Sequence, residues 1–169
     1  MIVEGRAWCF GDDINSDLLY PQAAFGLPLD EAVRYVFRAN RPGWVDEVQP
    51  GDIIVGGRNF GMGSARTAGA LLRRLGIAAC VADSFASLFF RNGVNTGLPV
   101  LSCPGISALV AEGDRLRLDL ATGVALNLST GADAEGAALP PELLATLAGG
   151  GVLASLERRG LIAPLSSPN

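Results

Sequence analysis

Short apolar runs alternate with helical patterns in the middle of the chain. The segments 50–57, 77–82 and 98–102 each contain a mainly apolar run bounded by turn-forming or polar residues. The stretches between them, 65–75 and 83–93, have the wider apolar spacing of helices. A strand–helix–strand–helix–strand order favours parallel pairing of buried strands. We therefore expect a mostly parallel sheet at the centre of an α/β fold.

Residues that commonly start or stop helices set the ends of these two elements. Gly76 is expected to end the first helix, which begins near Ala65. Asp83 or Ser84 is expected to cap the second.

Two further segments alternate strictly between apolar and polar residues. They are 114–120 and 124–130, and the intervening Ala-Thr-Gly predicts a hairpin. Residues 2–10 predict another strand. The sheet should therefore have an antiparallel part as well.

The remaining patterns are helical or irregular. In 29–40, Leu29, Val33, Val36 and Phe37 fall on one face of a predicted helix. Residues 140–160 predict two short helices around a glycine break. The alanine- and glycine-rich stretch 131–139 is expected to be a loose loop. No linker divides the chain, so 1–169 is expected to be one domain.

Composition excludes several classes of function. Of 169 residues, 49% are apolar and 18% charged, and the net charge is −4. No basic face indicates nucleic-acid binding, and no uninterrupted apolar stretch is long enough for a membrane span. The first ten residues lack the pattern of a signal peptide, so a cytoplasmic protein is expected.

The residue types that are missing narrow the chemistry further. The chain has neither histidine nor lysine, which removes the commonest general base and any Schiff-base nucleophile. Cys9, Cys80 and Cys103 are far apart in sequence and form no metal-binding motif, so no metal ligands are expected on this chain. Cys80 and Cys103 are expected to be small buried apolar residues. Catalysis must therefore use hydroxyl, thiol, carboxyl or guanidinium groups, or groups of a partner.

The segment 56–72, "GGRNFGMGSARTAGALL", is the strongest candidate for a site. A strand leads through four glycines into a helix, and the free N–H groups of a helix start attract anions. Ser64 stands at the N-cap position, and Arg66 adds a forked charge suited to a carboxylate or phosphate.

Other interpretations of this segment remain. A dinucleotide-binding fingerprint fits poorly, because Arg66 stands where a third glycine is needed. A Walker phosphate loop lacks its Lys-Ser/Thr pair. In a purely structural interpretation, Ser64 only caps the helix and Arg66 is a surface charge.

Several motifs in order resemble the small subunit of 3-isopropylmalate dehydratase, the swivelling domain of the aconitase superfamily. The resemblance covers nearly the whole chain. Its segments are "FGDDINSDLLYP" (10–21), "RPGWVDEVQPGDIIVGGRNFGMGSAR" (41–66), "DSFASLFFRNGVNTGLPVL" (83–101) and "GGGVLASLERRG" (149–160).

The resemblance implies a three-layer β/β/α fold, with a mostly parallel sheet and a smaller antiparallel sheet. It implies a hydro-lyase of leucine biosynthesis that interconverts 2- and 3-isopropylmalate or a related hydroxy-dicarboxylate. It also implies a large subunit that carries a 4Fe-4S cluster. This chain would be active only with that partner, and on its own it is a possible homo-oligomer.

The resemblance assigns roles by position. Ser64, directly after Gly63, matches the serine base of the family, and Arg66 matches its carboxylate-binding arginine. Backbone N–H groups and Arg66 are the kind of groups that stabilise a serine alkoxide. Gly63 belongs to the substrate-binding loop.

Three further residues are candidates for the substrate site. Asp17 matches an aspartate that organises the site, or it is a plain turn carboxylate. Asn59 either contributes to the site or accommodates an unusual backbone conformation. Phe25 matches the loop that selects the substrate side chain, with a core role as the alternative.

The motif departs from the family pattern at several positions. Ala65 replaces a substrate-binding serine, Thr67 replaces a glutamate, and Ala24-Phe25 replaces Tyr-Leu. Losing a hydroxyl contact to a carboxylate costs roughly 1–3 kcal/mol if nothing replaces it. The substrate therefore stays open among isopropylmalate, another organic acid, and an anion bound without catalysis.

Overall fold

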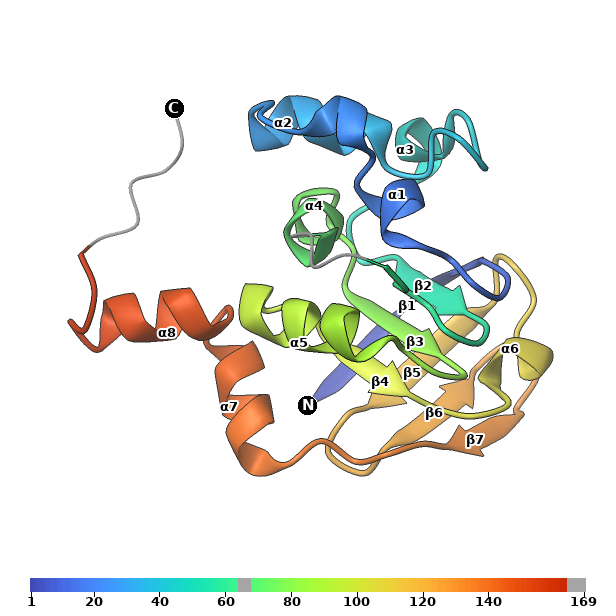
Figure 1. The fold of residues 1–169 in the computed structure, drawn as a ribbon. Helices are drawn as coiled ribbons and strands as arrows, with labels where there is room; N and C mark the ends of the chain where they lie inside the picture. Colours follow the sequence, from blue (N-terminus) through green and yellow to red (C-terminus); the bar gives the residue numbers. More distant parts are fainter. Residues whose placement is uncertain (64–67, 164–169) are drawn as a thin grey trace.

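The computed structural model describes residues 1–63 and 68–163. Its strands form one curled sheet in the order β4-β3-β2-β1-β5-β6-β7 (Figure 1). The strands are β1 (Ile2–Cys9), β2 (Ile53–Gly56), β3 (Ala79–Ala82), β4 (Val100–Ser102), β5 (Arg115–Asp119), β6 (Val124–Asn127) and β7 (Asp133–Glu135). The pairs β1–β2, β2–β3 and β3–β4 are parallel, and β1–β5, β5–β6 and β6–β7 are antiparallel.

Strand β1 joins the two halves of the sheet. Its residues 2–6 pair with β5, and its residues 7–9 pair with β2. The expected mostly parallel sheet with an antiparallel extension is therefore confirmed, and the two parts are continuous through β1.

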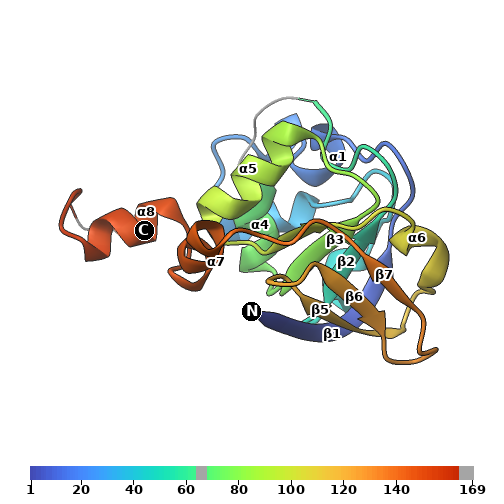
Figure 2. The ribbon, with the colours of Figure 1, turned by 90° about the horizontal axis from the view of Figure 1, so that it is seen from below.

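Helices surround this sheet and extend beyond it. They are α1 (Ser16–Leu19), α2 (Leu29–Ala32), α3 (Trp44–Glu47), α4 (Ala68–Arg74), α5 (Ser87–Thr96), α6 (Ile106–Leu109), α7 (Pro141–Ala148) and α8 (Val152–Arg158), with 3₁₀ turns η1 (Gln22–Ala24) and η2 (Val33–Tyr35). The two helices α7 and α8 confirm the expectation for 140–160, and α8 projects from the body of the molecule (Figures 1 and 2).

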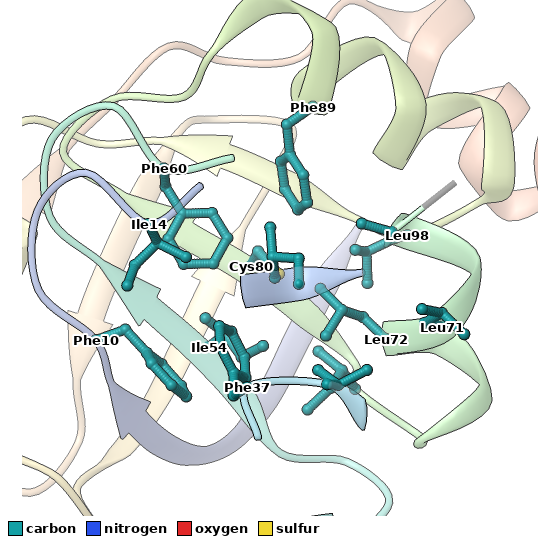
Figure 3. Packing of buried hydrophobic residues seen from close by; sticks show 14 of the residues in the cluster. Phe10, Ile14, Phe37, Ile54, Phe60, Leu71, Leu72, Cys80, Phe89 and Leu98 are labelled. Atoms are coloured by element: carbon teal, nitrogen blue, oxygen red, sulfur yellow. The ribbon is translucent and has the colours of Figure 1, made fainter. Parts of the chain in front are cut away.

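The parallel strands bury both faces, as their unbroken apolar runs predict. Ile54 and Cys80 face helices α4 and α5, where Leu72 and Phe89 pack against them (Figure 3). The alternate residue Val55 faces the opposite way, toward a second core that includes Leu118 of β5. The antiparallel half, the parallel half and the helices thus form the expected three layers.

Two of the cysteines are core residues, as predicted. Cys80 and Cys103 are fully buried, and they lie in the two different cores.

The single helix predicted over 29–40 is wrong. The chain forms α2, then η2, and then turns at Phe37, whose φ is +54°. This turn places the Phe37 ring against Phe10, with ring centroids 4.0 Å apart, and against Trp44. The apolar stripe therefore predicted burial correctly but not the helix.

The expected cap of the helix over 83–93 is also wrong. Helix α5 begins only at Ser87, because the candidate caps are used elsewhere. Asp83 accepts hydrogen bonds from the backbone and hydroxyl of Ser107, and Ser84 accepts one from the backbone of Asn59.

The loose loop expected over 131–139 is wrong in part. Residues Asp133–Glu135 form β7, which pairs with β6 at the edge of the sheet. The hairpin that precedes it is confirmed as β5 and β6. Within the described residues, no helix is long and apolar enough to cross a membrane.

Candidate active site

The loops that follow β1, β2 and β3 lie together at the carboxyl edge of the parallel strands. We call residues 57–63, which follow β2, the glycine loop. It continues the pairing of the sheet on both sides, through the bridges Asn15–Met62 and Phe60–Phe85. Ligand sites of open α/β sheets commonly lie at this edge.

Backbone hydrogen bonds join the glycine loop to the loop after β1. Asp13 N–H donates to the carbonyl of Arg58 at 2.8 Å, and Gly61 N–H donates to that of Ile14 at 2.6 Å. Ser16 N–H then donates to the Met62 carbonyl at 2.7 Å, so the pairing extends to the first residue of α1.

A second set of bonds joins the glycine loop to the loop after β3. Phe60 N–H donates to the carbonyl of Ser84 at 3.0 Å, and Ala86 N–H donates to that of Phe60 at 2.9 Å. The glycine loop is therefore the central strip of three, held on both edges.

Glycines allow this strip to pack closely against its neighbours. Gly61 has φ +81°, and an added Cβ would lie 2.3 Å from side-chain atoms of Phe89. Gly63 has φ +110°, and an added Cβ would lie 2.6 Å from Ser16 Oγ. At these two positions the protein's own packing requires glycine, before any ligand is considered.

Charged groups sit at the start of the glycine loop. Arg58 donates to Asp12 from its backbone N–H at 2.8 Å and from Nη2 at 2.7 Å. The backbone bond, and then the side-chain bond, hold the pKa of Asp12 below its ordinary value. The side-chain bond to Asp12, and then the negative charge of Asp12, raise the pKa of Arg58. Both groups are ionised near neutral pH, so Asp12 is not a proton-transfer group there.

Asn59, a predicted site residue, occupies the centre of the three loops. Its φ is +57°, so the unusual backbone conformation considered from the sequence is observed. Its side-chain amide donates to Asp13 Oδ1 at 2.9 Å, and its backbone N–H donates to Ser84 Oγ at 3.0 Å.

The other predicted site residues are distributed as follows. Ser64 and Arg66 lie outside the described residues, and Gly63 ends the described part of the glycine loop. Asp17 lies in the first turn of α1, where its N–H donates to the Asn15 side chain at 3.0 Å.

Phe25 follows the 3₁₀ turn η1 and packs edge-on against Tyr20, with ring centroids 5.1 Å apart. The residue is 46% exposed, which argues against the alternative of a core role. The structure thus brings Gly63 against Ser16 of α1, the residue before Asp17. It places Asn59 nearer the start of the glycine loop, where its side chain is hydrogen-bonded to Asp13.

Helix α4, which follows the glycine loop after the undescribed residues, is fixed by α5. Asn92 Oδ1 accepts a hydrogen bond from Gly69 N–H at 3.0 Å. An added Cβ at Gly69 would lie 2.5 Å from Thr96 Oγ1, so the two helices pack closely.

The cysteines do not fit an iron–sulfur cluster. Cys80 and Cys103 are buried in separate cores, and in residues 1–63 and 68–163 no three potential ligands are grouped for a metal ion. Burial raises the pKa of both thiols.

The sequence analysis missed Asp12, Asp13 and Ser84 as residues that organise the site. A signal for them existed. Each lies two or three residues after the end of a predicted strand, and the ends of parallel strands meet at one edge of a sheet.

Comparisons with known proteins agree with this arrangement. Residues 37–104 match the aconitase C-terminal domain. The chain is 40% identical over 161 residues to the isopropylmalate/citramalate isomerase small subunit of Methanocaldococcus jannaschii, covering 94% of this chain and 95% of that protein. It is 41% identical over 162 residues to the 3-isopropylmalate dehydratase small subunit of Pyrobaculum calidifontis, covering 94% and 99%.

A solved structure has the same fold. It is the crystal structure of 3-isopropylmalate dehydratase from Methanocaldococcus jannaschii, with a TM-score of 0.86, 29% identity, and coverage of 95% of this chain and 96% of that one. Identity at this level over nearly the full length of both chains shows common descent. The chain therefore belongs to the 3-isopropylmalate dehydratase small-subunit family of the aconitase superfamily.

Proposed function

We propose that the chain is the small subunit of a hydro-lyase that interconverts 2- and 3-isopropylmalate or a closely related hydroxy-diacid. The observation that carries the proposal is the near full-length match to small subunits of that name, 41% identical over 162 residues in one case. The glycine loop, fixed on both edges beside α1, supports it as a frame for a small anionic substrate.

Within this frame we assign the reaction to two residues by resemblance. Ser64 takes the proton from the carbon next to a carboxylate, and Arg66 binds a carboxylate. The frame supplies their support. Gly63 leads directly into Ser64, and its own position is set by the contact with Ser16.

We place the 4Fe-4S cluster of the family on a large subunit. The separate burial of Cys80 and Cys103 supports this placement, since neither thiol is available to a shared cluster. The small-subunit names of the relatives also support a two-chain enzyme. Iron is then expected in the complex and not in this chain alone.

The exposed apolar side chains next to the glycine loop mark the surface that we assign to the large subunit. Met62 belongs to the loop and is 41% exposed, and Leu88 precedes Phe89, whose ring packs against Gly61. Phe25 is exposed on the side of α1. Large apolar side chains of this kind are typical of the centre of a protein interface.

A second substrate is supported by one relative's name. The Methanocaldococcus protein is named for both isopropylmalate and citramalate. Ala65 and Ala24-Phe25 depart from the family motif at positions implied to contact substrate. An acid with a different side chain is therefore the alternative, and the same serine and arginine would act on it.

The proposal is tested by anaerobic co-expression with a cluster-bearing large subunit and ultraviolet detection of the unsaturated acid. Isopropylmalate and citramalate are compared, together with citrate- and malate-like acids. Ser64→Ala should lower kcat by about 10²–10⁴-fold without preventing assembly. Ser155→Ala, on the projecting helix α8, is the matched control and should keep full activity. A cluster-loaded wild-type complex that turns over none of these acids would contradict the proposal.

A further inference from the structure

Two neighbouring loops each contain a non-glycine residue in the left-handed region of backbone conformation. Asp13 has φ +56° and Asn59 has φ +57°, and Phe37 is the one other such residue in the described part of the chain. Asp and Asn tolerate this region better than most side chains, but they still need surrounding contacts to hold them there. The side chains of Asp13 and Asn59 are hydrogen-bonded to each other, at the edge of the sheet where the candidate site lies.

The contacts of Asn59 join all three loops. Its Nδ2 donates to Asp13 Oδ1 at 2.9 Å, on the loop after β1. Its backbone N–H donates to Ser84 Oγ at 3.0 Å, on the loop after β3. We call these contacts the Asp13–Asn59–Ser84 link.

The charged side chain of Arg58 does not compete with Asn59 for the carboxylate of Asp13. The guanidinium of Arg58, the residue before Asn59, donates to the Asp12 carboxylate, and the bond between Arg58 and Asp13 joins backbone groups. The link also lies upstream of the two backbone bonds that fix the rest of the glycine loop, from Gly61 to Ile14 and from Ser16 to Met62. We therefore expect a change at Asn59 to affect the position of the glycine loop as far as Gly61 and Met62.

We infer that Asp13 is a positioning residue for the proposed dehydration, which it serves by fixing Asn59 and with it the glycine loop up to Gly63. This inference rests on the proposed function. It assigns Asn59 a role in holding the loop through its Asp13-bonded amide, in place of direct recognition of the substrate. Small displacements of a catalytic frame cost rate more than binding, so the effect should appear in kcat.

The test uses variants that remove side chains without adding backbone strain. Asn59→Gly and Asp13→Gly both keep the left-handed conformation accessible. Asp13→Asn keeps an oxygen acceptor and is the conservative rescue. Asn40→Gly, in an exposed turn away from the site, controls for added chain flexibility.

In the assembled complex, each glycine variant should lower kcat about 10-fold or more while KM changes less than about 3-fold. The kcat of the double variant should lie within about 3-fold of the kcat of the less active single variant, because both substitutions remove the same hydrogen bond. Asp13→Asn should restore most of the kcat. Unchanged kcat in Asn59→Gly, a change confined to KM, or losses that multiply in the double variant would each overturn the inference.

Hydrogen exchange on the isolated chain provides a readout that needs no substrate. The amides of Gly61 and Ser16 should exchange about 10-fold faster in both glycine variants, but not in Asp13→Asn or Asn40→Gly. If the wild-type complex turns over no acid, the proposed function fails, and exchange alone then decides the inference. Unchanged protection of these amides would overturn it.

Discussion

The side chain of Glu112 continues the hydrogen bonding of β1 beyond the last backbone bond between this strand and the segment that contains Gly113. Gly113 N–H donates to the carbonyl of Ala7 at 2.9 Å, and two residues further along β1 the side chain of Glu112 accepts from the backbone N–H of Cys9 at 3.3 Å. Arg41 holds that carboxylate from the other side, through Nη1 at 2.6 Å. A carboxylate thus replaces a backbone carbonyl near the start of the loop that leads to the site.

Replacing Arg41 by alanine should cost about 1–2 kcal/mol of unfolding free energy. The variant loses a two-pronged ion pair with Glu112 and a guanidinium that lies 4.7 Å from the centre of the Trp8 ring. Arg74→Ala is the matched control, because its pair with Asp30 is more than half exposed on both sides and should contribute under about 0.5 kcal/mol. Urea unfolding of both variants checks this, and equal losses would contradict the special role of Arg41.

The thiol of Cys9 should be nearly inert in the folded protein. Burial, and then the negative charge of Glu112, raise its pKa to about 11. At pH 8 its thiolate population is then on the order of 100-fold below that of a free cysteine. Titration with a disulfide reagent should find almost no fast-reacting thiol in native protein and three after unfolding. A fast-reacting native thiol would show that the site around Glu112 opens.

The sequence predicts the layers of this fold better than its local irregularities. Apolar runs located the parallel strands because burial on both faces leaves no other pattern available. The helix over 29–40 failed at Phe37, where packing against Phe10 and Trp44 outweighs the local preference for helix. Strand β7 was missed because its three residues, Asp-Ala-Glu, have little strand propensity and are held by pairing with β6.

For the site, sequence reasoning identified the loop but not the contacts that hold it. The glycines were assigned to a loop that leads to an anion site, but the sequence did not show that Gly61 is required by Phe89 and Gly63 by Ser16. The partnership of Asn59 with Asp13 joins residues 46 positions apart, and no local pattern encodes such a contact. The assignments of Ser64 and Arg66 depend on the family motif and remain predictions.

Asp52 should make the stability of the chain depend on pH in the acid range. Burial alone would raise its pKa, but hydrogen bonds from Arg6, Gln49 and Trp8 outweigh this, and the pKa lies below its ordinary value. Stabilisation from such a carboxylate is present above the unfolded pKa of about 4 and is lost as the pH falls through the folded value.

Asp52→Asn should therefore cost about 2 kcal/mol at pH 7, and the difference from wild type should narrow as the pH falls below about 4. Urea midpoints at pH 7 and pH 3 measure both values. A difference of the same size at the two pH values would show that the ionised form is not the source of the stabilisation.

Gly61 and Gly131 allow the packing of the glycine loop to be separated from its backbone conformation. Their φ angles are +81° and +83°, so alanine is strained equally at both positions. An added Cβ at Gly131 meets nothing within 4 Å, whereas at Gly61 it would lie 2.3 Å from Phe89. Gly131→Ala should therefore cost only about 1 kcal/mol, the backbone term. Gly61→Ala should cost about 2–4 kcal/mol, because either the loop or the Phe89 ring must move out of a packed core. Thermal or urea unfolding of the two variants gives the difference directly.

Since Phe89 belongs to α5 and α5 holds α4 through Asn92, the same displacement should also lower kcat in the assembled complex, which Gly131→Ala should leave unchanged. Equal stability losses at the two glycines would mean that the glycine loop is not closely packed against α5, and would contradict the packing that we expect to hold the site in place.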